Sequence, residues 1–178
     1  MKAKIKVKLL NENCKPLMSD NGEAIDLRSA INVKMKAPQY RNRRKLVDEN
    51  DGKYFRDVDV ETCLIPLGVA IQLPAGYKAD VKPRSSTPIK FNVICANSIG
   101  LIDNSYCGDN DEWKFNALAF GQSDIREGDR ICQFEISLSQ KATIWQRIKW
   151  LFTNGVELEF VDSLDNEDRG GHGTSGVK

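Results

Sequence analysis

The stretch GLIDNSYCG, residues 100–108, brings one carboxylate and one phenol to the end of a short apolar run. Leu101 and Ile102 have the apolar character of a buried strand, and Asp103 follows them at once. A carboxylate that a strand holds in place and partly desolvates is suited to act as a general base on water, which contributes ~10²–10⁴-fold in rate. Tyr106 offers a ring face to a sugar or a base. The alternative is an Asx-turn that only joins two strands.

Two other turns carry groups that suit phosphate oxygens. PRSS (83–86) follows a strand-like run and offers one guanidinium fork and two hydroxyls. GDRICQ (128–133) leads into an apolar strand and places Gln133 in it, where the amide needs a partner from the backbone or from a ligand. Taken alone, each of these segments is also compatible with an ordinary solvated turn or a structural hydrogen bond.

The C-terminal segment DRGGHGTSGVK (168–178) is rich in glycine. Such a segment cannot offset the entropy of its own ordering without a ligand or a partner surface. We therefore expect residues 166–178 to form a flexible arm that orders over a bound anion through backbone N–H groups, hydroxyls and Arg169. A disordered end with no role is the alternative.

Short strand-like runs separated by turn residues have to position these groups. The sequences LPAGY (73–77) and EGDR (127–130) are typical of turns. Many short strands with regular turn spacing predict an all-β sandwich, jelly roll or barrel, here as one domain over residues 1–165. The expected strands are 4–10, 62–67, 69–73, 77–82, 91–97, 113–120, 130–138 and 156–161.

Two segments break the strand pattern. Residues 34–58 are polar and highly charged with little periodicity, which predicts a long surface loop; its run RNRRK could contact a partner or be a solvated face. Residues 143–152, TIWQRIKWLF, have apolar positions at helical spacing, which predicts one short amphipathic helix. We expect this helix to pack on the sandwich, and a partner groove is the alternative.

Composition narrows the class of protein further. The 178 residues are enough for one domain with a real core, and the 26 basic and 25 acidic residues nearly cancel, so no overall field favours nucleic acid or membranes. The N-terminus alternates lysine with apolar residues and has no signal-peptide core, and no apolar run has the length of a membrane span. Five cysteines with no CxxC spacing suit a reducing compartment. The sequence therefore predicts a cytoplasmic protein with no membrane or direct nucleic-acid partner.

Taken in order, five segments of the chain resemble the five motifs of the trimeric dUTPase (dUTP diphosphatase) family, in particular its longer phage and Gram-positive forms. The third segment is the most specific of them. The five are GEAIDLRSA (22–30), PRSS (83–86), NSIGLIDNSYCG (97–108), GDRICQ (128–133) and RGGHGTSG (169–176).

The resemblance implies a distorted jelly roll that assembles as a homotrimer, in which each active site draws motifs from several subunits. It implies the hydrolysis of dUTP to dUMP and pyrophosphate, with Mg²⁺ bound to the triphosphate. Such an activity would limit uracil in DNA and supply dUMP for thymidylate synthesis.

The resemblance also implies a role for each matching residue. Asp103 matches the base that activates the attacking water, and Asp26 matches the carboxylate that holds the metal through water. The other residues are expected to contact the nucleotide: Arg84, Ser85, Ser86 and Gln133 at the phosphates, Asn97, Leu101, Ile102 and Lys114 at the uracil, Tyr106 under the deoxyribose, His172 against the uracil face, and Arg169, Thr174 and Ser175 at the outer phosphates.

The chain departs from the family pattern in places. His172 stands where a phenylalanine usually stacks on uracil, and Ala24 and Ile25 replace the usual glycine and aromatic residue before Asp26. The third motif is followed by the insertion-like DNDEW (109–113), which affects how Lys114 aligns.

Three rival functions share this fold. A dCTP deaminase, or a bifunctional deaminase and dUTPase, requires a catalytic glutamate in the strand after the hairpin, and WKFNALAF (113–120) has none. The third is a regulatory protein that binds a repressor or another protein partner through the additional segments 34–58 and 143–152. Catalysis and partner binding do not exclude each other.

Overall fold

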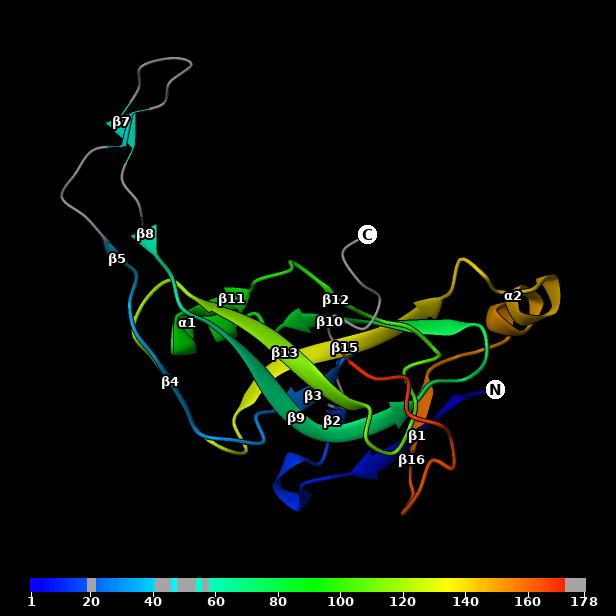
Figure 1. Cartoon of the computed structure of the whole chain (residues 1–178). Coiled ribbons are helices and arrows are strands. Elements are labelled where there is room, and N and C mark those ends of the chain that lie inside the picture. The colour runs from blue at the N-terminus through cyan, green and yellow to red at the C-terminus, as the bar shows by residue number, and fades with distance from the viewer. Residues whose placement is uncertain (19–21, 41–45, 48–53, 56–57, 172–178) are drawn as a thin grey trace.

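The computed structural model describes residues 1–18, 22–40, 46–47, 54–55 and 58–171, and strands dominate it (Figure 1). Two five-stranded sheets form the body. The first has the order β11 (Val93–Cys95), β13 (Glu112–Ala119), β9 (Thr62–Gln72), β1 (Ala3–Leu9) and β16 (Val156–Phe160). The second has the order β12 (Gly100–Ile102), β10 (Tyr77–Pro83), β15 (Arg130–Leu138), β3 (Ile25–Arg28) and β2 (Leu17–Met18). The all-β, distorted jelly-roll prediction is confirmed, and neither sheet closes on itself.

The core lies between the two sheets because apolar residues alternate with polar ones along the strands. In β13 every second side chain is buried, and in β1 the same alternation buries Ile5 and Val7. Fully buried Trp113 of β13 meets Phe134 of β15 edge to face, with the ring centroids 5.1 Å apart, and so joins the two sheets. The same alternation turns the neighbours of Phe134 outward, where they are free to form a site.

β9 spans the two runs, 62–67 and 69–73, that the sequence predicts as separate strands on either side of Gly68. The glycine has a φ of +64°, and a Cβ there would lie 2.7 Å from the Cβ of Cys14, so only glycine fits. Its N–H donates to the Glu112 Oε1 at 2.9 Å, beside an irregularity in the pairing of β9 with β13. The chain therefore continues through Gly68 as a single strand of 11 residues.

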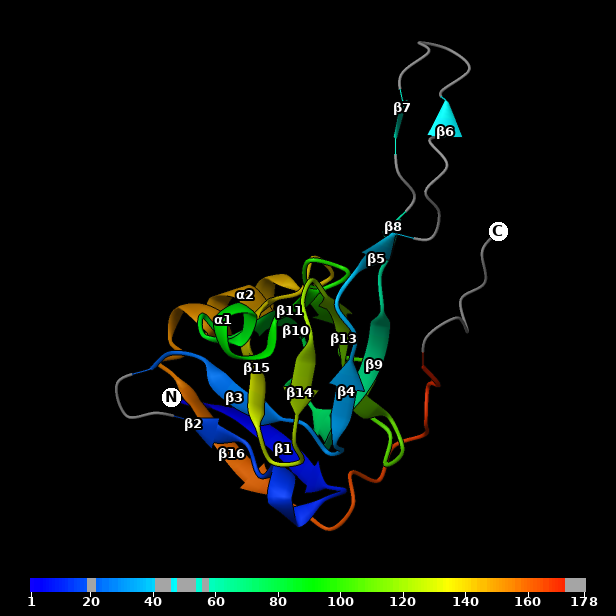
Figure 2. The ribbon, with the colours of Figure 1, turned by 90° about the vertical axis from the view of Figure 1, so that its left-hand side faces the viewer.

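The charged segment 34–58 is more structured than the surface loop that the sequence predicts. Where the structure describes it, short strands pair with each other and lead away from the sandwich (Figure 2). Their neighbour β4 pairs with β14 at the base. The run RNRRK lies outside the described residues. The strands are β4 (Val33–Met35), β5 (Gln39–Tyr40), β6 (Leu46–Val47), β7 (Tyr54–Phe55), β8 (Val58–Asp59) and β14 (Ser123–Ile125).

The predicted helix forms as α2 (Ile144–Leu151), with a capping box between Thr143 and Gln146. Two further helical segments are present, the 3₁₀ helix η1 (Glu12–Cys14) and the five-residue helix α1 (Thr87–Phe91). The expectation that the apolar stripe of α2 packs on the sandwich is wrong for the single chain, because Ile144, Trp145 and Leu151 are each more than 70% exposed. Trp150 makes the contact instead, 5.3 Å from the Tyr77 ring.

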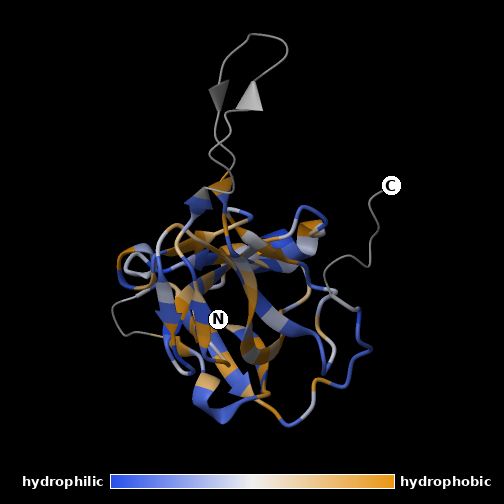
Figure 3. Ribbon diagram, turned by 60° about the vertical axis from the view of Figure 1, so that its left-hand side comes forward, coloured by the Kyte–Doolittle hydropathy of each residue, from blue (hydrophilic) through white to orange (hydrophobic). Residues whose placement is uncertain are grey.

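Figure 3 shows how hydropathy follows this architecture, with apolar residues alternating along the strands of the body. No helix in the described part of the chain is both long enough and apolar enough to cross a membrane.

Candidate active site

Asp103 lies at the end of β12, immediately after Ile102. Its backbone carbonyl accepts a hydrogen bond from the Tyr106 N–H at 3.0 Å, which fixes the turn that follows. Its carboxylate accepts a hydrogen bond from the Arg169 Nη1 at 3.2 Å, so the arm contacts the end of the strand here. The expected partial desolvation of Asp103 is absent in the single chain, since the side chain is 57% exposed.

A small pocket of about 70 Å³ lies next to this strand end, between β12 and β13. Tyr106 is half-buried there and donates its hydroxyl to the Glu112 carbonyl at 2.9 Å. Burial raises the pKa of the phenol, and the neighbouring Asp111, Glu112 and Asp168 carboxylates add to the effect. Of the residues predicted to contact the uracil and the sugar, those that the structure describes all line this pocket, namely Asn97, Leu101, Ile102, Tyr106 and Lys114.

The phosphate-binding candidates form a second group around Asp26, which is 8% exposed on β3. The Arg84 Nε donates to its Oδ1 at 2.8 Å, and the Arg130 Nη1 donates to its Oδ2 at 3.1 Å. Gln133 is the direct cross-strand partner of Asp26. One carboxylate thus holds two guanidiniums at the strand ends, and each keeps further N–H donors for an anion.

The PRSS turn is held in place by α1. Pro83 ends β10 as expected, and the Thr87 N–H donates to the Arg84 carbonyl at 3.0 Å. The buried Thr87 hydroxyl donates to the Ile131 carbonyl at 2.7 Å, which fastens α1 to β15. Ser85 is exposed, and the side chain of Ser86 does not cap the helix, so both hydroxyls are available to a ligand.

β10 separates the two groups within one chain. Ala79 pairs with Ile102, the residue before Asp103, whereas Arg84 follows Pro83 at the other end of the strand. At ~3.3 Å per residue the backbone positions of Ala79 and Arg84 lie roughly 17 Å apart. A single phosphate cannot reach hydrogen-bonding distance of both groups in one chain.

The donor set near Asp26 fits only one kind of metal site. Among the residues that the structure describes, no three His, Cys, Asp or Glu side chains gather to hold a metal ion. Mg²⁺ usually keeps several waters and binds through one or two carboxylates together with substrate phosphates. Asp26 fits as the single carboxylate that contacts a hydrated Mg²⁺ carried by a triphosphate.

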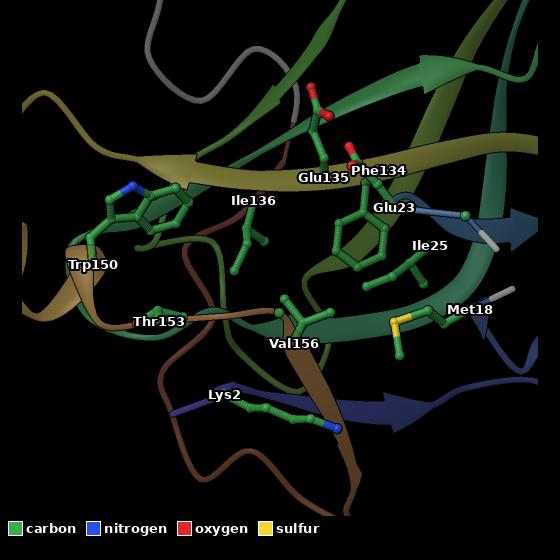
Figure 4. Close-up of a pocket in the computed structure, with 12 residues that line it drawn as sticks. Lys2, Met18, Glu23, Ile25, Phe134, Glu135, Ile136, Trp150, Thr153 and Val156 are labelled. Atoms are coloured by element: carbon green, nitrogen blue, oxygen red, sulfur yellow. The ribbon is translucent and has the colours of Figure 1, made fainter. Parts of the chain in front are cut away.

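A larger cavity of about 560 Å³ lies elsewhere, lined by inner-face residues such as Ile25 and Phe134 and by Trp150 (Figure 4). Ile25 directly precedes Asp26, and Phe134 directly follows Gln133. The two-residue period of a strand turns consecutive side chains to opposite faces. The cavity therefore opens on the other face of the sheet and contains none of the predicted site residues.

Two residues of the site were not predicted from the sequence. Arg130 lies inside the GDRICQ motif, but only the pairing of β15 with β3 brings it to Asp26. Asp111 lies in the insertion-like segment and binds the arm beside Arg169. Three other predicted residues, His172, Thr174 and Ser175, lie outside the described residues.

Comparison with known proteins supports the family resemblance. A profile of the dUTPase family matches residues 55–176. The SPbeta prophage-derived deoxyuridine 5'-triphosphate nucleotidohydrolase YosS of Bacillus subtilis is 41% identical over 175 residues, covering 98% of this chain and 99% of that protein. A deoxyuridine 5'-triphosphate nucleotidohydrolase of Orientia tsutsugamushi is 39% identical over 66% of this chain and 71% of its own length.

Solved structures show the same fold at lower identity. A dUTPase of Streptococcus mutans superposes with a TM-score of 0.59 at 19% identity, over 78% of this chain and 98% of that one. A dUTPase from phage phi11 of S. aureus, described for its coordination of a structural Mg(II) ion, has a TM-score of 0.57 at 19% identity over 79% and 94%. The Staphylococcus bacteriophage 80alpha dUTPase, described as controlling transfer of virulence genes, has a TM-score of 0.58 at 19% identity over 79% and 93%. On the strength of the family profile and the near full-length prophage relative, this chain belongs to the dUTPase family.

Proposed function

We propose that this protein hydrolyses dUTP to dUMP and pyrophosphate, and so limits uracil in DNA and supplies dUMP for thymidylate synthesis. The observation that carries the proposal is Asp103, which stands at the end of β12 beside a pocket lined by the five predicted uracil and sugar contacts that the structure describes. In the reaction the Asp103 carboxylate takes a proton from water, and the water oxygen forms a bond to the α-phosphorus. The bond that joins the α-phosphate to the β-phosphate breaks, and pyrophosphate leaves with the electron pair.

In this proposal the pocket residues select the nucleotide. Asn97, Lys114 and the backbone at Leu101 and Ile102 hydrogen-bond uracil, and cytosine is rejected because its 4-amino group reverses the donor pattern. The ring of Tyr106 lies under the deoxyribose, where a ribose 2′-hydroxyl would collide with it. The half-buried position of that ring, fixed by its hydrogen bond to the Glu112 carbonyl, supports this role.

The proposed site is shared between subunits of a homotrimer. The attacked phosphate must lie near Asp103 and also near Arg84, Ser85, Ser86 and Gln133, and β10 separates those groups by roughly 17 Å in one chain. A second copy removes the conflict by bringing its own Arg84 and Gln133 to the first copy's Asp103. Arg169, Thr174 and Ser175 then close on the outer phosphates, and His172 stacks on the uracil.

Mg²⁺ is the cofactor that this proposal requires, bound to the triphosphate and contacted by Asp26 through water. Bound there, it neutralises phosphate charge and fixes the conformation of the triphosphate. The two guanidiniums on Asp26 support a phosphate site beside it, because each keeps further N–H donors for an anion. The proposed compartment is the cytoplasm, which the five free cysteines support.

The paired strands β5 and β8, which project from the body, favour a second function that is compatible with the first. We propose that this projecting segment can bind a repressor or another protein partner. Asp103→Asn should then abolish hydrolysis while partner binding persists.

The experiment that tests the proposed reaction measures pyrophosphate release with Mg²⁺ from dUTP, dTTP, dCTP and UTP. We expect turnover of dUTP alone, and a loss of ~10²–10⁴-fold in kcat for Asp103→Asn. Because Asp103 is exposed, the variant should keep the wild-type melting temperature. Folded wild-type protein that does not release pyrophosphate from dUTP would overturn the proposal.

A further inference from the structure

Cys95 lies where the two sheets meet, beside the pocket of about 70 Å³ between β12 and β13, which we call the base pocket. Cys95 ends β11, the edge strand of the first sheet. Residues 96–99 connect it to Gly100, which begins β12, the edge strand of the second sheet. The Cys95 side chain is 7% exposed and lines the base pocket, although the proposed reaction assigns it no role.

The Cys95 thiol is directed at the side chain of Asn97. Its Sγ donates to the Asn97 Oδ1 at 3.0 Å. Burial raises the pKa of the thiol, and hydrogen bonds from the backbone of Asn97 and Gly100 to the sulfur offset this effect only in part. The thiol therefore keeps its proton at pH 7. Because the backbone groups occupy the acceptor side of the sulfur, the S–H is left for the amide oxygen.

The backbone that carries Asn97 is fixed by its own hydrogen bonds. The Ala96 N–H donates to the Asn116 carbonyl of β13 at 2.8 Å, and the Ser98 N–H donates to the Cys95 carbonyl at 3.1 Å. Ser98 has a φ of +62°, a left-handed conformation that residues other than glycine rarely adopt. With this backbone held in place, the side-chain torsions of Asn97 are the freedom that remains.

The contact with Cys95 decides which end of the Asn97 amide a ligand meets. An asparagine amide has an acceptor at one end and two donors at the other. With Oδ1 bound to the thiol, Nδ2 keeps both hydrogens, and this side chain forms no second hydrogen bond within the described part of the chain. Asn97 is exposed and lines the base pocket, so the Nδ2 donors are available to a bound base.

Uracil and cytosine differ at the 4-position, where uracil has a carbonyl oxygen and cytosine has an amino group. We propose that Cys95 is a positioning residue that sets the specificity of the base pocket, because it holds the Asn97 amide with its donor end toward the 4-position of the base. If the amide turned by 180°, Oδ1 would accept a hydrogen bond from a 4-amino group, and the same pocket would bind cytosine. This inference deepens the proposed dUTP hydrolysis and rests on it for its kinetic readout.

The first test measures a specificity ratio, the inhibition constant of dCTP divided by the Michaelis constant for dUTP. Cys95→Ala should lower this ratio about threefold to tenfold, the size of one hydrogen bond. The kcat for dUTP should stay within about twofold of wild type, because Asp103 is untouched. Cys95→Ser keeps a donor and should keep the wild-type ratio.

The matched control is Cys63→Ala, which removes a partly buried thiol on β9 outside the base pocket and should leave the ratio unchanged. Melting temperatures of all variants show whether each one is folded. An unchanged ratio in folded Cys95→Ala, or an equal loss in Cys95→Ser, would overturn the inference.

The second test is a double-mutant cycle that asks whether Cys95 acts through Asn97. Asn97→Ala removes the amide, so adding Cys95→Ala to it should not change the specificity ratio further. Losses that multiply would mean that the thiol affects the pocket by another route, and would overturn the positioning role.

The third test needs no catalysis. The NMR order parameter of the Asn97 Nδ2, identified by the signal that Asn97→Ala lacks, should be high in nucleotide-free wild type and Cys95→Ser. It should fall below about 0.6 in Cys95→Ala, a value typical of a flexible group. Equal mobility in wild type and Cys95→Ala would overturn the inference. A wild type that does not hydrolyse dUTP would instead refute the proposed function, and this measurement would still decide whether the thiol holds the amide.

Discussion

The Arg130 Nη1 lies 3.1 Å from the Asp26 Oδ2, while the Arg84 Nε takes the other oxygen of the same carboxylate at 2.8 Å. Asp26 is nearly buried, and the two guanidiniums come from strand ends far apart in the sequence. One carboxylate therefore organises both cations of the candidate phosphate site.

Asp26→Asn should destabilise the protein by about 1–3 kcal/mol, because it leaves two guanidiniums beside each other without their anion. Urea unfolding at pH 7 measures the change. The matched control is Asp80→Asn, which breaks the partly exposed Lys78–Asp80 pair on β10 and should cost about 0–1 kcal/mol. Equal costs for the two variants would contradict the organising role of Asp26.

Tyr106→Ala should raise the ratio of kcat/KM for UTP to that for dUTP at least tenfold, because the ring that excludes the 2′-hydroxyl is removed. Tyr106→Phe keeps the ring and should keep the discrimination. It should still cost about 0.5–1.5 kcal/mol of stability through the lost hydrogen bond to the Glu112 carbonyl. Steady-state kinetics with both nucleotides separates the two variants, and an unchanged ratio in Tyr106→Ala would exclude the ring as the selector.

The hydrogen bonds that hold residues 163–168 to Asp109 and Asn110 should persist down to about pH 4. Hydrogen bonds from the Leu164 N–H and the Ser163 hydroxyl, with Lys8 nearby, lower the pKa of Asp109 below its ordinary 3.8. The Asn110 side chain and N–H likewise lower the pKa of Asp168, against the opposing effects of desolvation and of the Asp109 charge. Since both groups have lower pKa values when these hydrogen bonds are formed, the contacts are intact above pH 3.8 and weaken as the pH falls below it.

An NMR titration of the Leu164 and Asn110 amides measures this release. The midpoints should lie below 3.8, with the indole signal of the buried Trp113 reporting global unfolding separately. Midpoints well above pH 4, with the Trp113 signal unchanged, would contradict the assignment of these hydrogen bonds.

His172→Phe should keep or lower the Michaelis constant for dUTP, because a phenyl ring stacks on uracil at least as well as imidazole. The wild-type Michaelis constant should also rise below about pH 6.5, where the imidazole becomes charged, and the variant should not show this rise. Steady-state kinetics at pH 8 and pH 6 tests both expectations. A clear increase of the constant in the variant at pH 8 would count against the stacking role.

α2 shows how far periodicity alone reaches. The spacing of its apolar residues predicts a helix, and Thr143 and Gln146 cap it. The same spacing says nothing about which surface covers the apolar stripe, and in the single chain Ile144, Trp145 and Leu151 remain exposed. Hydrophobic periodicity depends on the sequence of one helix alone, whereas burial also depends on the surface that packs against that helix.

The sequence by itself determined the longer strands of the two main sheets and the family, although it missed the short strands between residues 33 and 59. Alternation along a strand is local, so at the N-terminus it assigns Ile5 and Val7 to the core and the lysines between them to the surface without knowledge of any neighbour. The motifs that identify the chain are likewise short runs whose order along the sequence is directly visible. Only the tertiary structure decided which distant residues meet: Arg130 with Asp26, Asp111 with the arm, and Arg169 with Asp103. These contacts depend on strand register and on the path of loops that join the sheets, and many residues far apart in the sequence fix both together.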